Sequence, residues 1–291
     1  MRRRLLALLL ALWPAAAVAD TLFYQPLNRD AALTADQWQQ LWQQAQRDGY
    51  RQVIVQWSAY GDERFSAGDW LLTSLTAAQQ QGLALVIGLA ADPQYFRTLQ
   101  QPGWQDQFSS YWAAMQLQSL LEQQRLQPLL AARGIAVAGW YLPAELSDRL
   151  FQEGRRRQDT LTQLQELAGR LDRPLHVSAY STGVLSPEGN ASWLSGLEQA
   201  GLRVWWQDGE GTRELPAPVR QAYRQALPCA IGVVREAFSQ VTAADAPFQA
   251  VPATPQPPLP CHPDAVFSLN YLPWAGVLRQ GGPIENGPPS R

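Results

Sequence analysis

Short apolar runs alternate with longer segments of helical period along most of the chain. The runs are rich in β-branched and aromatic residues, as expected for buried strands. We predict strands at Leu22–Gln25, Val53–Trp57, Ala84–Leu89, Val137–Leu142, Leu175–Tyr180, Val204–Gln207, Ala230–Arg235 and Val266–Tyr271. Helices are predicted between them at Ala35–Arg47, Trp70–Gln81, Ser109–Arg133, Asp159–Leu171, Ser192–Ala200 and Pro218–Gln225. This alternation favours parallel strands joined by helical crossovers, and the strand count predicts a single α/β domain, a (β/α)8 TIM barrel.

The first predicted helix indicates how the helices pack on the barrel. Its apolar residues recur with the spacing of one helix face, at Trp38, Leu41, Trp42 and Ala45. Trp38 and Trp42 are therefore predicted to lie in the core rather than in a ligand site. Thr34 and Gln37 are spaced as a capping box, which predicts the start of this helix.

The amino-terminal residues have the layout of a secretory signal peptide. A basic start is followed by the apolar run Leu5–Trp13 and by small residues that end at Ala19, which predicts a signal peptide at residues 1–19 cut after Ala19. A retained membrane anchor is the alternative. The barrel domain is predicted at 20–274, with no membrane span, and a Gly- and Pro-rich disordered tail at 275–291. The chain is then periplasmic or secreted.

The two cysteines, Cys229 and Cys261, fit an exported protein because an isolated pair in an oxidising compartment usually forms a disulfide. A metal site is the alternative, but only His176 and His262 could add imidazole ligands. Each cysteine precedes a predicted strand, so the disulfide would join the amino-terminal ends of two neighbouring strands. The segment 239–263 between them is rich in proline, and we predict that the last crossover has no helix.

Composition excludes several functional classes. The net charge is −2 and the chain has no lysine, which leaves no basic surface for a nucleic-acid backbone. No glycine-rich phosphate loop is present, so no nucleotide cofactor is predicted. Neither histidine follows the end of a predicted strand, which argues against a Ser/His/Asp hydrolase. We expect neither a metal nor a cofactor.

Two glutamates end predicted strands on the face where TIM-barrel enzymes carry their catalytic groups. Glu145 follows the fourth strand and Glu236 ends the seventh. A pair of carboxylates is what glycosidic bond cleavage requires. The alternative is that each is an ordinary loop glutamate paired with a nearby arginine such as Arg149 or Arg235.

Amides and aromatic side chains accompany the glutamates, and together they are typical of carbohydrate sites. The candidates for binding a saccharide are Gln25, Gln56, Trp57, Trp140, Tyr180, Trp206, Gln207, Asp208, Asn270 and Trp274. Asp208 is also a third candidate for a catalytic acid, or alternatively a residue of an Asx turn. The tryptophans have the alternative of simply filling the core.

These strand-end motifs resemble the bacterial domain-of-unknown-function 4434 family. The resemblance rests on the ordered segments Phe23-Tyr24-Gln25-Pro26, Gln56-Trp57, Asp92-Pro93, Gly139-Trp140-Tyr141 with Glu145, Gln207-Asp208-Gly209 and Glu236 with Phe238. It implies a glycoside-hydrolase-like TIM barrel. A more distant resemblance, to the retaining glycosidases of clan A, implies Glu145 as acid/base and Glu236 as nucleophile. That clan usually has asparagine before the acid/base, where this chain has Ala144.

The hypothesis is therefore an exported glycoside hydrolase acting on a polysaccharide. The alternative is a non-catalytic carbohydrate-binding or scaffold protein with the same fold.

Overall fold

The computed structural model describes residues 20–242, 246 and 248–279. The predicted signal peptide, 1–19, and the predicted tail beyond residue 279 lie outside the described residues. Within those ranges, no helix is both long and apolar enough to cross a membrane.

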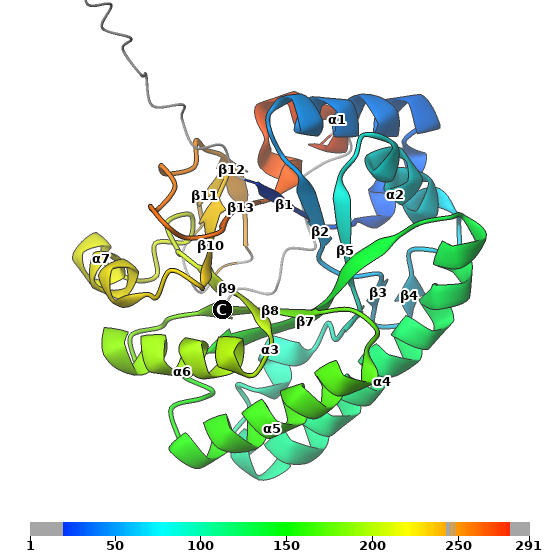
Figure 1. The fold of residues 1–291 in the computed structure, drawn as a ribbon. Coiled ribbons are helices and arrows are strands. Elements are labelled where there is room, and N and C mark those ends of the chain that lie inside the picture. The colour runs from blue at the N-terminus through cyan, green and yellow to red at the C-terminus, as the bar shows by residue number, and fades with distance from the viewer. Residues whose placement is uncertain (1–19, 243–245, 247, 280–291) are drawn as a thin grey trace, which may run out of the picture.

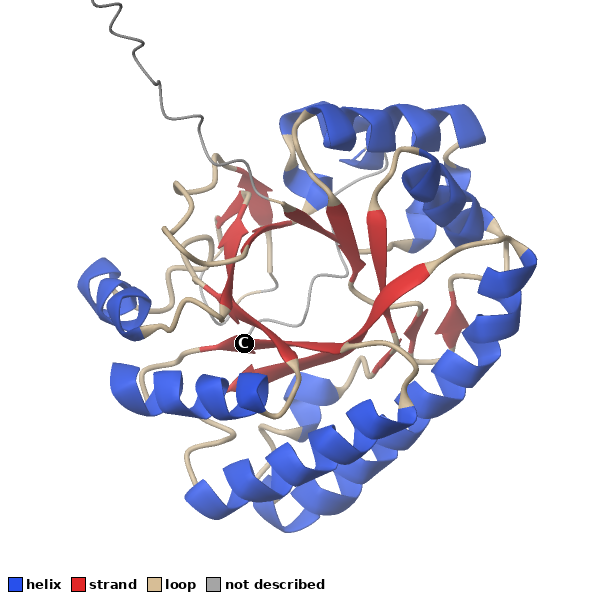
Figure 2. Ribbon diagram, in the orientation of Figure 1, coloured by secondary structure: helices blue, strands red, loops and turns tan. Residues whose placement is uncertain are grey.

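Eight parallel strands close into a barrel, as predicted from the sequence (Figure 1, Figure 2). Their order around the barrel is β1-β13-β10-β9-β8-β7-β5-β2. The strands are β1 (Thr21–Tyr24), β2 (Gln52–Val55), β5 (Ala84–Gly88), β7 (Val137–Ser147), β8 (Leu175–Tyr180), β9 (Arg203–Gln207), β10 (Gly232–Glu236) and β13 (Asp264–Phe267). The last strand ends earlier than predicted, because the chain turns into the 3-10 helix η2 (Leu269–Tyr271).

The six predicted helices are all present around the barrel. They are α1 (Ala35–Arg47), α2 (Trp70–Gln80), α4 (Trp104–Ala132), α5 (Gly154–Arg170), α6 (Pro187–Gln199) and α7 (Ala217–Ala226). Four of them, α4, α5, α6 and α7, begin before the predicted residue, α7 by a single residue. In α6 the reason is local, since the Ser186 hydroxyl caps the helix by accepting from the Gly189 N–H at 3.1 Å and Pro187 occupies the first turn.

Several short elements escaped prediction because they are too brief to show a period. They are η1 (Asn28–Ala32), β3 (Ala59–Tyr60), β4 (Glu63–Arg64), β6 (Ala90–Ala91), α3 (Tyr95–Thr98), β11 (Phe238–Gln240), β12 (Ala250–Pro252) and η3 (Pro273–Arg279). The last of these corrects one boundary. Residues 275–279, predicted as disordered tail, form part of η3, where Ala275 and Leu278 are buried in the core next to α1.

The last crossover contains no helix in its described part, as predicted. Between β10 and β13 the chain forms the antiparallel pair β11 and β12 and then an extended proline-rich segment, which occupies the gap between α7 and α1 in Figure 1. Cys229 and Cys261 form a disulfide with a Cα–Cα distance of 5.3 Å. They precede β10 and β13, which pair directly, so the predicted bond between two neighbouring strands is confirmed.

Two layers of side chains make up the core. The inner layer fills the barrel with Phe23, Ile54, Val86, Tyr141, Trp205, Val234 and Ala265. The outer layer lies between strands and helices and includes Trp38 and Trp42, whose rings stack 6.2 Å apart and meet Tyr24 of β1 edge to face. These two tryptophans are thus core residues, as predicted. The Thr34–Gln37 capping box is also present, with bonds of 2.8 and 3.3 Å.

Asp30, in η1, carries a fully buried carboxyl group. The Tyr24 hydroxyl and the Leu27 N–H both donate to Oδ2, at 2.8 and 2.9 Å, while Oδ1 has no hydrogen-bond partner in the described part of the chain. Burial raises the pKa of Asp30 from 3.8 to about 6. A carboxyl whose pKa is higher in the folded state contributes its full stability below the unfolded pKa and loses part of it as the pH rises through about 6.

Asp30→Asn should therefore stabilise the protein at neutral pH by about 1–3 kcal/mol relative to the wild type, and not at pH values below about 4. The amide oxygen can still accept from Tyr24 and Leu27, and no charge is buried. Urea unfolding of both proteins across this pH range measures the difference. Asp36→Asn, at an exposed aspartate in the first turn of α1, is the matched control. An equal difference at both ends of the pH range would contradict the prediction.

Candidate active site

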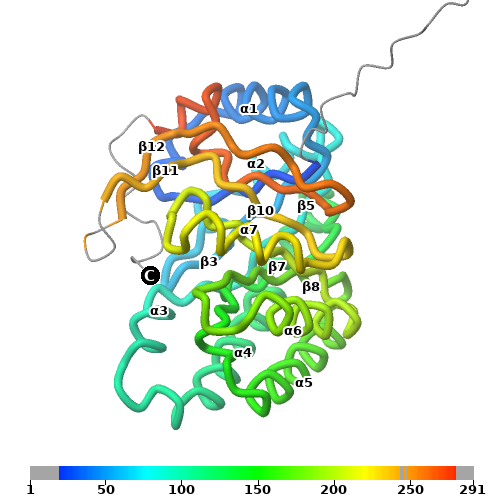
Figure 3. Tube along the Cα trace, turned by 90° about the vertical axis from the view of Figure 1, so that its left-hand side faces the viewer, coloured from blue at the N-terminus to red at the C-terminus, as the bar shows by residue number. Residues whose placement is uncertain are grey.

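The carboxyl ends of the barrel strands share one end of the molecule, on the left in Figure 3 near β3, β11 and β12. Because successive side chains alternate between faces of a strand, each inner-layer residue identifies which later residues point inward. Gln25, Gln56, Gln207 and Glu236 each lie two residues beyond an inner-layer residue. These four side chains therefore continue the inner face into the mouth of the barrel.

Glu145 reaches the inner face by way of a bulge in β7. Leu142 pairs with Val177, but Glu145 pairs with Ser178, so Pro143 and Ala144 are extra residues on this strand. Proline lacks the N–H that a regular ladder needs, which accounts for a bulge at this point. The Ser178 hydroxyl is 2.8 Å from the hydroxyl of Tyr141, an inner-layer residue, so Ser178 faces the inside of the barrel. Glu145 pairs with Ser178 and therefore faces the inside as well.

Two tyrosines surround Glu145. The Tyr95 hydroxyl donates to the backbone carbonyl of Glu145 at 2.8 Å. Burial raises the pKa of Tyr95 and of Tyr141, and the nearby Glu145 carboxylate raises both further. Both phenols therefore stay protonated beside this carboxyl group.

Glu236 is held by the backbone of the loop that follows β9. The Gly209 N–H donates to Oε1 at 2.9 Å and the Glu210 N–H donates to Oε2 at 3.1 Å. The loop can approach this closely because residue 211 is a glycine. A Cβ at that position would lie only 2.8 Å from the Glu236 Cβ and would clash with it. Both oxygens are thus oriented by donors, and Arg235, the alternative partner in the sequence interpretation, pairs instead with Asp264 of β13.

Asp208 does not share this environment. Its side chain is completely buried and forms a two-bond ion pair with Arg224 of α7, one bond being 2.7 Å long. Glu210 forms an ion pair with Arg220, also of α7. These two pairs fasten the loop after β9 to α7, so Asp208 is a structural anchor, and its candidacy as a catalytic acid is corrected accordingly.

Four amides lie around the mouth. Asn270 donates from Nδ2 to the Gln25 backbone carbonyl at 3.3 Å. The side-chain oxygens of Gln56 and Asn270 are buried and accept no hydrogen bond from any described residue. Buried polar atoms are normally paired, so these two oxygens are suited to accept hydrogen bonds from a ligand.

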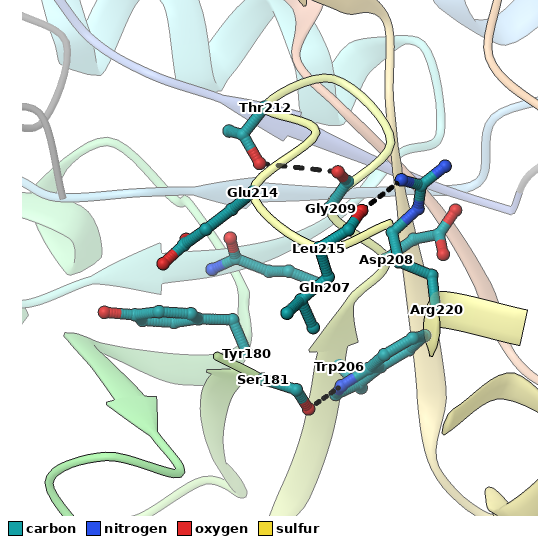
Figure 4. Close-up of a pocket in the computed structure, with 10 residues that line it drawn as sticks. All are labelled: Tyr180, Ser181, Trp206, Gln207, Asp208, Gly209, Thr212, Glu214, Leu215 and Arg220. Carbon is teal, nitrogen blue, oxygen red and sulfur yellow. Dashed lines mark hydrogen bonds between the residues drawn. The ribbon is translucent and has the colours of Figure 1, made fainter. Parts of the chain in front are cut away.

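The predicted aromatic platforms divide into two groups. Tyr180 lines the mouth together with Gln207, and Figure 4 shows Tyr180, Gln207 and Glu214 pointing in the same direction. Trp206 follows the inward-pointing Trp205 and belongs to the outer layer, where its indole donates to the Ser181 hydroxyl at 3.1 Å and stacks on Tyr223, so its candidacy as a sugar platform is corrected. Trp57 is also buried and donates to the Pro26 carbonyl at 3.1 Å.

Trp140 and Trp274 lie away from the mouth, which corrects two candidates. Trp140 is fully buried in the outer layer and donates to Asp172, in the loop before β8, at 2.9 Å. Alternation back from Tyr141, which points inward, could have shown that Trp140 points outward. Trp274 packs on the outer wall beside Leu41 and Gln44 of α1, because η3 carries it there.

Neither histidine reaches the mouth. His176 is buried inside the barrel, where it stacks on Trp205 and its Nδ1 accepts from the indole N–H at 3.1 Å. Burial lowers the pKa of His176 to about 4, so the ring is neutral at physiological pH. His262 lies beside the disulfide, with Nδ1 2.9 Å from the Ile231 carbonyl oxygen. No group of three or more metal-ligating side chains occurs among the residues described.

The sequence interpretation missed the groups that surround the two glutamates. Tyr95, at the start of the short helix α3, and the Gly209 and Glu210 N–H groups, in the loop after β9, contact the two glutamates. Their only sequence signal was position after a predicted strand, and position alone does not distinguish a side chain that reaches the mouth from one that faces solvent.

Comparison with known proteins agrees with the fold. A protein of Escherichia coli (strain K12), the uncharacterized protein YbcH, is 35% identical over 290 residues, covering 93% of this chain and 96% of that protein. A crystal structure of a putative α-L-fucosidase from Bacteroides thetaiotaomicron superposes with a TM-score of 0.54 at 14% identity, covering 87% of this chain and 83% of that chain. The second likeness shows that the two chains share a fold. The family described as domain of unknown function DUF4434 matches residues 20–254, and the chain belongs to that family.

Proposed function

We propose that this protein is an exported glycoside hydrolase that cleaves a polysaccharide with retention of configuration. The observation that carries the proposal is the placement of Glu145 and Glu236 on the inward side of β7 and β10, at the carboxyl ends of strands three positions apart around the barrel. Retaining glycosidases need one carboxylic acid and one carboxylate on either side of the scissile bond.

The surroundings of the two glutamates favour different roles. Glu236, with one backbone donor on each oxygen, is oriented as a nucleophile. Glu145, three strands away around the barrel, is then the residue that acts as the acid/base. In the first step a Glu236 oxygen attacks the anomeric carbon, the glycosidic C–O bond breaks, and the leaving oxygen takes the Glu145 proton. In the second step Glu145 takes a proton from water, the water oxygen attacks the anomeric carbon, and the bond to Glu236 breaks.

Retaining glycosidases of clan A usually have an asparagine directly before the acid/base residue in the sequence. Here Gln56 and Asn270 supply the contacts to the sugar that this asparagine would make. Ala144, in that position here, is fully buried within the β7 bulge and offers no polar group. The buried oxygens of Gln56 and Asn270 can accept from the sugar hydroxyls instead. Hydrogen bonds to these hydroxyls that strengthen in the transition state add to catalysis.

Export is supported by the disulfide, because such bonds persist in oxidising compartments. A polysaccharide outside the cytoplasm is then the matching class of substrate.

The direct test is incubation of the protein with cell-envelope and exopolysaccharide preparations. We expect release of reducing ends, and nuclear magnetic resonance of the first product formed should show the anomeric configuration of the substrate. Initial inversion would contradict the nucleophilic role of Glu236. Saturable binding without any release of sugar would support instead the non-catalytic carbohydrate-binding function, which Ala144 favours.

A further inference from the structure

A groove runs from the barrel mouth over the loops that follow β5, β7, β8 and β9. Its volume is about 460 Å³, within the range of roughly 300–1,000 Å³ usual for small-molecule sites. Tyr180 and Glu214 line both this groove and the pocket beside Gln207, so the two adjoin. The far wall is formed by Trp104 at the start of α4.

Trp104 is a half-buried indole whose position is fixed by its neighbours. The Arg156 guanidinium lies over its ring at 4.7 Å, and Phe108 meets it edge to face at 5.8 Å. Arg156 is itself held by a bond to the Leu150 carbonyl at 2.7 Å and an ion pair with Glu153. A half-buried aromatic ring that is immobilised in this way can bind an apolar sugar face with little loss of side-chain entropy.

The polar walls of the groove carry one charge of each sign. Arg149, from the loop after β7, and Glu214, from the loop after β9, are both exposed and both line it, together with Thr182. An arginine donates to hydroxyl oxygens and a carboxylate accepts from hydroxyl groups. Because the two charges balance, this arrangement suits an uncharged, hydroxyl-rich ring better than an acidic one.

We propose that this groove is a second saccharide subsite, which binds an uncharged sugar ring on Trp104 between Arg149 and Glu214. The inference rests on the proposed function, since it extends the same substrate away from the two glutamates. It makes the substrate a neutral oligosaccharide or polysaccharide that occupies the mouth and the groove together.

The test measures binding and cleavage of the same probes. Partial acid hydrolysis of the exopolysaccharide and cell-envelope preparations gives oligosaccharides, which are separated by length and, by ion exchange, into neutral and acidic fractions. Binding is measured by calorimetry on Glu236→Gln protein, with and without Trp104→Ala. The matched control is Trp274→Ala, because Trp274 is also a half-buried tryptophan but lies on the outer wall.

We expect Trp104→Ala to weaken binding of long neutral oligosaccharides about tenfold, equal to about 1.4 kcal/mol, and to leave disaccharide binding unchanged. Trp274→Ala should change neither.

Equal binding of long oligosaccharides with and without the Trp104→Ala substitution, an equal loss for disaccharides, or preference for the acidic fraction would each overturn the subsite. Length-dependent loss without cleavage by the unsubstituted protein would sustain the subsite and reject hydrolysis. If Trp104→Ala left cleavage unchanged at every oligosaccharide length, hydrolysis would be sustained and the subsite rejected. Absence of any binding would reject both the subsite and hydrolysis.

Discussion

Glu236→Gln is expected to lower kcat by on the order of 10⁴-fold, because the amide cannot attack the anomeric carbon. Glu236→Ala should recover part of that activity when azide is added, since the anion can enter the space left by the carboxylate. The product would be a glycosyl azide of inverted configuration. Glutamine has one acceptor oxygen for two N–H donors, Gly209 and Glu210, so a loss of about 1–3 kcal/mol in stability is also expected. Activity is therefore compared below the unfolding transition, checked by circular dichroism.

Glu145→Gln should behave differently, and the contrast assigns the roles. Loss of an acid/base costs about 10²- to 10⁴-fold, but much less for an aryl glycoside whose leaving group needs no proton. Glu166→Gln, at an exposed glutamate of α5, is the matched control and should leave kcat unchanged. Unchanged sugar release by both Glu236→Gln and Glu145→Gln would reject the two-carboxylate mechanism. Azide rescue of Glu145→Ala with inversion, and none of Glu236→Ala, would exchange the two roles.

Removal of the disulfide should lower the free energy of unfolding by about 3–4 kcal/mol. The bond closes a loop with a sequence separation of 32, and its loss returns that loop entropy to the unfolded chain. The effect should be concentrated at β10 and β13, whose crossover has no helix in its described part. Urea unfolding of the Cys229→Ser/Cys261→Ser double variant, compared with the oxidised protein, measures it.

Two controls separate the bond from the side chains. The wild-type protein with dithiothreitol should match the double variant, and dithiothreitol should not change the variant. Because the disulfide lies at the amino-terminal ends of the strands, kcat should stay within about twofold below the unfolding transition, since catalytic groups belong to the other end of a TIM barrel. An equally stable reduced protein would show that the crossover is held by other contacts, such as the Arg235–Asp264 pair.

The barrel could be predicted because its signals are local. Apolar runs, the helical stripe of α1 and the Thr34–Gln37 capping box each span a few neighbouring residues, and the structure reproduces them. Burial of Trp38 and Trp42 followed from the same stripe. The short elements, such as the antiparallel pair of β11 and β12, could not be predicted, since they exist only because distant segments meet.

The candidate site was predictable only where it lies on strands. Glu145, Glu236 and Gln56 were found because parallel strands bring their carboxyl ends together whatever the loops do. The misplaced aromatic candidates failed for one reason: the side of the wall on which an indole lies depends on register and on the path of the chain beyond the strand. Trp274, for example, is carried to α1 by a 3-10 helix that has no sequence period.

The sequence by itself determined the strand and helix order, the cysteine pair and the two strand-end glutamates, because each of these depends on near neighbours or on composition. The tertiary structure alone decided that Gly209 and Glu210 hold Glu236, that Asp208 forms an ion pair with Arg224, and that Trp104 lines a groove beside Tyr180. Those contacts join loops far apart in the chain, and their formation depends on the closure of the barrel.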